Sequence, residues 1–106
     1  MTVKEVIETV DALRPNEIAA EDKRKWLYWL ESRIYEDLYV THEHEGIRFT
    51  DTEKILSDGA TELFIKAPHD EIYILYLCSL IDFYHAEYER YANDNALFEA
   101  LYESCC

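Results

Sequence analysis

One stretch decides the predicted fold: it reads DEIYILYLCSLIDFYHAEYERY from Asp70 to Tyr91. Every residue of Ile72–Ile81 except Ser79 is apolar. A buried strand would suit that composition, but helical spacing continues to the end of the stretch, which is too long for an ordinary strand. The apolar run is also too short to cross a bilayer, and Asp82 closes it. We therefore predict a helix from Asp70, a suitable N-cap, to Tyr91.

The apolar arc of this predicted helix is wide. Tyrosines form one stripe, Ile74, Cys78 and Ile81 lie beside it, and Ser79 and Asp82 are expected to face away. One neighbouring helix cannot cover such an arc, so we predict that one side packs inward and the other against a partner, because Tyr is common at interfaces. Packing in the core alone is the alternative. The candidate interface residues are Tyr73, Tyr76, Tyr84, Tyr88 and Tyr91.

Three further helices are predicted on either side of this stretch. Thr2 and Glu5 read as a capping box ahead of a short helix that Pro15 ends. The second helix is placed from Glu21 to Tyr39, where Leu and Ile recur at helical spacing. Asn93-Asp94-Asn95 is expected to interrupt the pattern, because these side chains compete for backbone hydrogen bonds. A final helix then follows.

The segment Val40–Ala67, between the second and third helices, has no regular periodicity. Ser57-Asp58-Gly59 predicts a turn, and Ile47-Arg48-Phe49 and Leu63-Phe64-Ile65 are candidates for short extended pieces. Loops of this length in a small domain are often functional. The predicted fold is therefore all-α, a small bundle of about four helices with a long irregular loop between the second and third. A single domain is expected to span residues 1–106.

The cysteines fit a reducing compartment. Cys78 lies in the apolar run and is expected to be an inert core residue, while the neighbours Cys105 and Cys106 are poorly placed to pair with each other. The last helix ends without Gly, Pro or a basic final turn. One interpretation is that the chain was cut within a longer helix.

The charge is strongly negative. Lys and Arg number 10 and Asp and Glu number 23, for a net charge of −13. This argues against bound nucleic acid and against anionic lipid, because both are recognised through Lys and Arg. An acidic surface is still compatible with a channel along which DNA slides without being held. Solubility alone is the other explanation.

Metal-binding patterns are weak. His42-Glu-His-Glu45 offers divalent-metal ligands, but His42 and His44 share one side only in a strand and a third ligand is not identifiable. We therefore favour a solvated acidic loop over a metal site there. Asp82-x-x-His85 with Glu89 matches only part of the helical di-iron pattern, which needs two Glu-x-x-His helices.

Catalytic patterns are no stronger. The sequence contains no Gly-x-Ser-x-Gly elbow, phosphate-binding glycine loop or dinucleotide fingerprint. His85, beside Tyr84 and Tyr88, is interpreted as a hydrogen-bonded interface histidine rather than a proton shuttle. The sequence therefore predicts a protein that is not an enzyme and uses no cofactor and no metal.

Several stretches together resemble a known family. They are Leu63–Leu77, Ile81–Phe83, Glu87–Asn93 and Leu97-Phe98, with Trp26-Leu27 and Arg33–Glu36 in the amino-terminal half. This pattern resembles small proteins from tailed-phage and prophage structural gene clusters, the head–tail connector or head-completion adaptor family. It covers most of the chain and is a helical packing pattern without a chemical signature.

The resemblance implies a mainly α-helical structural protein without catalytic activity. Such proteins assemble as a homo-oligomeric ring beneath the portal protein and bridge it to the tail-side completion protein, with DNA passing through the channel. The implied location is the head–tail junction of the virion, after synthesis in the bacterial cytoplasm. The resemblance implies that family members continue past the equivalent of Cys106 with a helix end that contains Trp and Arg, whereas this sequence stops short of such a helix end.

Two alternatives remain open. An acidic helical adaptor, or an inhibitor that mimics DNA, would also explain the charge of −13. A DNA mimic is expected to carry carboxylates in two rows on one face, whereas a connector is expected to spread them around the side that faces the channel. A metalloenzyme or metal carrier that uses His42 and His44 is the third hypothesis.

Overall fold

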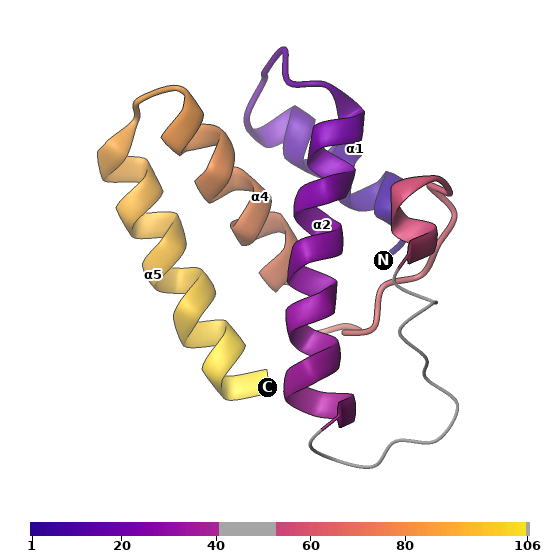
Figure 1. The fold of residues 1–106 in the computed structure, drawn as a ribbon. Helices are drawn as coiled ribbons and strands as arrows, with labels where there is room; N and C mark the ends of the chain where they lie inside the picture. The colour runs from indigo at the N-terminus through magenta and orange to yellow at the C-terminus, as the bar shows by residue number, and fades with distance from the viewer. Residues whose placement is uncertain (41–52, 106) are drawn as a thin grey trace.

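The computed structural model describes residues 1–40 and 53–105, and these form a small all-α bundle, which confirms the predicted fold class. Its α-helices are α1 (Val3–Leu13), α2 (Ala20–Ile34), α4 (Glu71–Tyr84) and α5 (Tyr88–Cys105) (Figure 1). A π-helical segment, η1 (Tyr35–Val40), prolongs α2, and η2 (Lys54–Leu56) is a short 3₁₀ helix. The described residues include no strand, only an isolated antiparallel bridge between Thr2 and Glu62.

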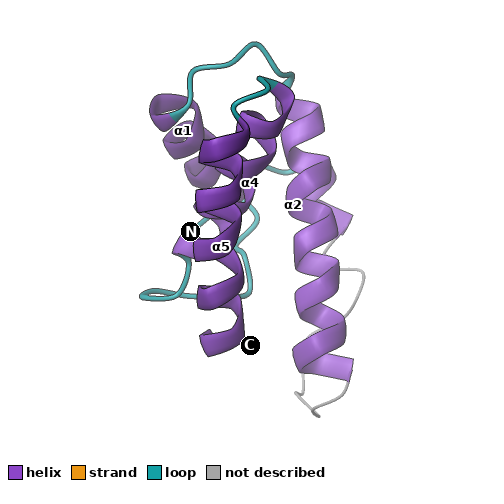
Figure 2. Ribbon diagram, turned by 90° about the vertical axis from the view of Figure 1, so that its left-hand side faces the viewer, coloured by secondary structure: helices purple, strands orange, loops and turns teal. Residues whose placement is uncertain are grey.

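The central helix is α4. It contacts α1, α2 and α5, and Figure 2 shows α1 and α2 on opposite sides of it. This position explains the wide apolar arc, because three helices of the same chain cover it. Tyr73, Leu77 and Ile81 are fully buried. Ser79 and Asp82 are buried as well, so the prediction that they face away is wrong.

The capping box at the start of α1 is confirmed. The Glu5 backbone N–H donates to Thr2 Oγ1 at 3.2 Å, and the Thr2 N–H donates to Glu5 Oε1 at 3.0 Å. Together these bonds satisfy two backbone donors that a helix start leaves without partners. Val3, Val6 and Val10 then lie on one face and are fully buried, so docking in the core stabilises a helix that is too short to form alone.

The third helix ends seven residues before the predicted Tyr91, at Tyr84. Ala86 has a φ of 59°, in the left-handed region. The Glu87 N–H donates to the Asp82 carbonyl at 2.8 Å, and the Ala86 N–H donates to the Phe83 carbonyl at 3.1 Å. These two bonds define a Schellman motif, which usually places Gly at the left-handed position. Because Ala86 occupies it, the sequence contains no ordinary signal for this helix end.

The predicted interruption at Asn93-Asp94-Asn95 is wrong, because α5 runs through it without a break. Asp94 is buried and faces Arg14, with Asp94 Oδ2 at 3.4 Å from Arg14 Nη2. An Asp side chain that pairs with a distant cation no longer competes for nearby backbone groups. The tertiary contact therefore overrides the local preference.

The segment before α4 follows the beginning of α1. The turn predicted at Ser57–Gly59 is present, and Asp58 Oδ1 accepts a hydrogen bond from the Ala60 N–H at 3.0 Å. The Leu63 N–H donates to the Met1 carbonyl at 3.1 Å. Leu63 and Ile65 are buried but form no strand. The extended piece proposed at residues 47–49 lies outside the described residues.

Candidate partner interface and buried polar clusters

The five candidate interface tyrosines lie in different surroundings. Tyr73 is fully buried, Tyr76 and Tyr91 are partly buried, and Tyr84 and Tyr88 are exposed. Because α4 ends at Tyr84, the expected single stripe is divided between α4 and α5. Because Tyr73 is fully buried, it is unavailable to a partner in this fold. The role of the other four tyrosines in a partner interface stays a prediction.

An exposed aromatic surface lies where α2 meets the end of α4. Trp29 is 57% exposed and Tyr84 is 67% exposed. Buried Trp26 supports Tyr84, with ring centroids 5.5 Å apart. We call Trp26, Trp29 and Tyr84 the α2-side aromatic surface. Large exposed aromatic side chains in one place are typical of contact sites.

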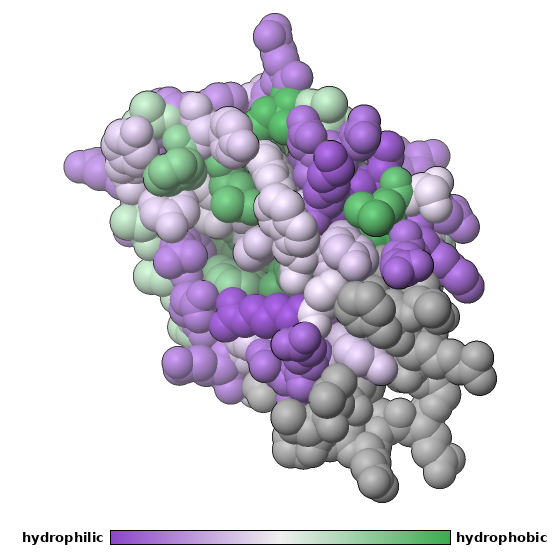
Figure 3. All heavy atoms as spheres, viewed as in Figure 1, coloured by the Kyte–Doolittle hydropathy of each residue, from purple (hydrophilic) through white to green (hydrophobic). Residues whose placement is uncertain are grey.

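A second aromatic surface lies on the other side of the same helix end, next to α5. The Phe83 ring packs edge-on against Tyr88 and Tyr91, with centroids 5.8 Å and 5.3 Å away. Phe83 and Tyr88 are both more than half exposed. We call these three residues the α5-side aromatic surface. On the face shown in Figure 3, green and pale side chains gather over α4 and α5, with strongly hydrophilic ones around them.

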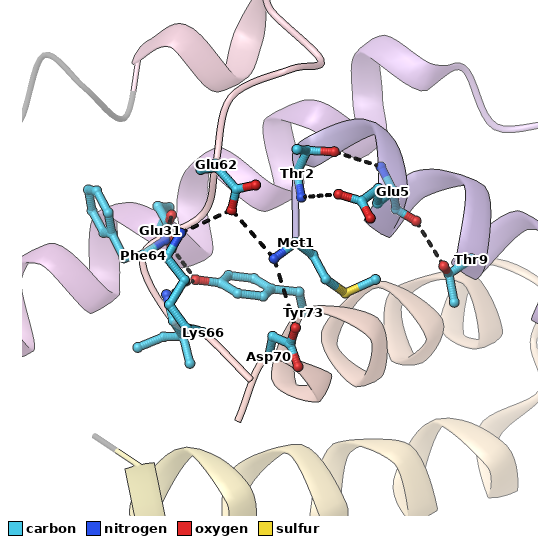
Figure 4. A network of polar contacts seen from close by, with 11 residues as sticks. Met1, Thr2, Glu5, Thr9, Glu31, Glu62, Phe64, Lys66, Asp70 and Tyr73 are labelled. Carbon is cyan, nitrogen blue, oxygen red and sulfur yellow. Dashed lines mark hydrogen bonds and ion pairs between the residues drawn. The ribbon is translucent and has the colours of Figure 1, made fainter. Parts of the chain in front are cut away.

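A buried carboxylate joins α2 to the segment before α4 (Figure 4). Glu31 is 1% exposed. Its Oε1 accepts from the Tyr73 hydroxyl at 2.7 Å and its Oε2 accepts from the Phe64 N–H at 2.7 Å. The Tyr73 oxygen in turn accepts from the Ile65 N–H at 2.9 Å. Burial raises the pKa of Glu31 to about 7, although both hydrogen bonds oppose the increase.

A second buried cluster joins the end of α1 to α4 and α5. Asp82 is 1% exposed, and the Arg14 Nε lies 3.2 Å from its Oδ1. Arg14 also reaches Asp94, and Arg90 Nε lies 4.0 Å from Asp82 Oδ1. The pKa of Asp94 rises to about 6, because burial disfavours its charge and Asp82 is close, while Arg14 opposes the shift. This arrangement positions three helices relative to one another.

A buried lysine fixes the loop between α1 and α2. Lys23 Nζ lies 2.6 Å from Asp11 Oδ1 and 3.1 Å from Asn16 Oδ1. The Asn16 amide donates to Asp11 Oδ1 at 3.0 Å, and its oxygen accepts from the Ile18 N–H at 3.0 Å. The buried ammonium of Lys23 is therefore paired with a carboxylate and an amide oxygen, as burial of charge requires.

The candidate chemical residues do not come together. Asp82 is engaged by arginines, and His85 and Glu89 are exposed near the junction of α4 and α5. Across residues 1–40 and 53–105, no three His, Cys, Asp or Glu side chains are grouped to hold a metal ion. His42 and His44 lie outside the described residues. Cys78 is buried as predicted, and burial raises the pKa of its thiol to about 11.

Some residues of these clusters were missed by the sequence interpretation. Glu31 and Lys23 share the helical face of Leu27 and Leu30, so their positions within the apolar stripe were a usable signal of buried charge. Trp29 falls on the side of α2 away from that stripe and is exposed. Arg14 had no such signal, because its partners Asp82 and Asp94 are distant in the sequence.

Comparisons of this chain with protein-family models, with curated protein sequences and with solved structures give no match. Among the described helices, none is long and apolar enough to span a membrane.

Proposed function

We propose that this protein is a non-enzymatic structural subunit that works through contacts with other proteins, in a ring of the phage head–tail connector type. The observation that carries the proposal is the pair of aromatic surfaces on two sides of the end of α4. A subunit within a ring contacts each neighbour through a different patch, and so does a subunit that bridges two proteins. Two distinct apolar surfaces meet that requirement.

The charge supports the same proposal. A net charge of −13 suits a channel wall that must let DNA pass without binding it. The family resemblance supplies the specific context, in which the neighbours are further copies of the chain, a portal protein and a tail-side completion protein. An acidic adaptor or DNA-mimicking inhibitor is the second candidate, favoured by the charge alone.

Light scattering and electron microscopy of concentrated protein test the proposal. We expect oligomers that grow with concentration and close into rings. Replacing Phe83 and Tyr88 of the α5-side aromatic surface by Ala should weaken association, whereas Leu97→Ala, which removes a comparably exposed side chain elsewhere on α5, should not. A strictly monomeric protein at all concentrations, also in the presence of a portal protein, would contradict the connector function.

A further inference from the structure

A hollow lies against the α2-side aromatic surface. It has a volume of about 620 Å³. It is lined by Glu17 and Ile18 of the loop between α1 and α2, by the first turns of α2, and by Tyr84 of α4. Three of the side chains that line it are aromatic, Trp26, Trp29 and Tyr84, and three are charged, Glu17, Asp22 and Lys25. We call it the α2–α4 groove.

Two of the aromatic residues that line the groove are accessible to a ligand. Trp29 and Tyr84 are both more than half exposed, and the buried Trp26 ring holds Tyr84 in place. Indole and phenol faces attract cations through their quadrupoles, Trp most strongly. In the described part of the chain the only cation found over a ring is Arg33, over Tyr102. Among residues 1–40 and 53–105, no cation therefore lies over a ring of the groove.

The lining adds two carboxylates. Glu17 and Asp22 both line the groove and both are exposed. Lys25 also lines it and brings a positive charge, so the local balance is one negative charge. The net charge of the whole chain is −13, which draws cationic partners toward the surface.

The chain's own arginines are poor candidates for the occupant. Arg14 is bound to Asp82, and Arg24 Nε donates to the Leu56 carbonyl at 3.3 Å. Arg33 lies 3.7 Å from Glu99, and Arg90 lies 3.4 Å from Glu87. Each arginine that the structure describes is thus engaged within its own molecule.

We propose that the α2–α4 groove binds an arginine side chain from an extended or helical segment of a different, basic protein. A guanidinium is flat, so it stacks on an aromatic face while its N–H groups donate to a carboxylate, which an ammonium does less well. Apolar residues beside that arginine would cover Trp29 and Ile18. This inference rests on one part of the proposed function, namely that the protein works through contacts with other proteins. It does not require that the protein forms a ring.

Peptide binding to the dilute protein tests the inference. The probe is a capped, fluorescein-labelled hexapeptide with two arginines and two leucines, and its match has citrulline at both arginine positions. We expect saturable binding of the arginine peptide at low ionic strength and at least tenfold weaker binding of the citrulline peptide. Trp26 and Trp29 are the only tryptophans, so unlabelled peptide should also change the intrinsic fluorescence.

Variants locate the site. Trp29→Ala and the pair Glu17→Gln, Asp22→Asn should each weaken binding about tenfold. Lys25→Gln should strengthen it, because the change removes a positive charge that repels the arginine. The matched controls are Leu97→Ala and Glu89→Gln, which alter exposed residues outside the groove. Circular dichroism verifies that each variant is folded.

Three outcomes would overturn the inference. They are equal binding of the arginine and citrulline peptides, binding that the groove variants leave unchanged, and no saturable binding of either peptide. Self-association that depends on Trp29 while the peptide does not bind would instead assign the groove to a second copy. If rings form but the peptide does not bind, the connector function is supported and the groove proposal fails. If the peptide binds but no rings form, the groove proposal is supported and the connector function fails.

Discussion

Glu31 is held in the core by two hydrogen-bond donors and has no cation at its oxygens in the described structure. Its pKa rises from 4.5 to about 7 because burial disfavours the charge. Between these two pH values the folded state binds more protons than the unfolded state. The contribution of this group to stability is therefore greatest below about pH 4.5 and is lost as the pH rises through 7, by roughly 3 kcal/mol in all.

The first prediction concerns Glu31→Gln. The variant should lose this pH dependence, because glutamine does not titrate. Glutamine also has only one side-chain oxygen, so the Phe64 N–H and the Tyr73 hydroxyl no longer each have a carboxylate oxygen to donate to. Urea denaturation at several pH values between 5 and 8 measures the free energy of unfolding of both proteins. Glu89→Gln, on the surface, serves as control and should keep the slope of the original protein. Parallel curves for Glu31→Gln and the original protein would show that Glu31 does not titrate as described.

The second prediction concerns Arg14, which lies between Asp82 and Asp94. Arg14→Ala should lower the free energy of unfolding by about 3 kcal/mol, because it leaves buried Asp82 with only the more distant Arg90. The loss should be much smaller when Asp82→Asn is present, since no buried charge then remains at that position. Urea denaturation of the four proteins of this double-mutant cycle gives the coupling energy. Lys4→Ala, which removes one member of an exposed pair, should change little. Additive losses in the cycle would refute the coupling.

At the scale of the helix, the turn between α4 and α5 holds Ala86 in a conformation that suits glycine. Ala86→Gly should therefore raise the free energy of unfolding by about 1 kcal/mol, since the residue is exposed and loses no packing. Ala92→Gly is the matched control, because Ala92 is exposed inside α5, and it should lower stability by about 1 kcal/mol. Thermal and urea denaturation measure both. A decrease for Ala86→Gly would mean that this residue is not left-handed in solution.

The helices were predictable where a local pattern governs them. The capping box of Thr2 and Glu5 and the apolar stripe of α2 each follow from neighbours within one or two turns. The end of α4 could not be predicted, because Ala86 adopts the conformation of a glycine. The continuation of α5 through Asp94 could not be predicted either, because Asp94 is stabilised by Arg14, which lies 80 residues away in the sequence.

The candidate interface was predictable only in part. Tyrosine spacing identified an amphipathic face, and Tyr84 and Tyr88 are indeed exposed. The same spacing could not distinguish the buried Tyr73 from the exposed tyrosines. The burial of Tyr73 depends on its hydrogen bond to Glu31, which joins α4 to α2. The α2–α4 groove could not be foreseen either, since Glu17 and Tyr84 meet only when three segments pack together.

For the whole molecule, the dominant quantity is the charge of −13. Like charges on a compact surface repel each other more than on an expanded chain, so this charge opposes folding. The ion pairs of Arg14 and Lys23 lie in or near the core and are screened little by salt. The exposed carboxylates are screened strongly. Salt should therefore stabilise the fold while it weakens any contact with a cationic partner.

The fourth prediction follows from this opposition. Raising the NaCl concentration from low to physiological and above should raise the Tm steadily, because a shorter Debye length weakens the repulsion among the exposed carboxylates. Glu36→Gln together with Glu103→Gln removes two exposed negative charges that form no ion pair within the described residues and that lie away from helix N-termini, so it should raise the Tm at low salt and reduce the salt dependence. Calorimetry in NaCl and in KCl separates screening from effects of a particular ion. A Tm that falls with salt would mean that attractive surface pairs outweigh the net repulsion, and the argument that the total charge opposes folding would then fail.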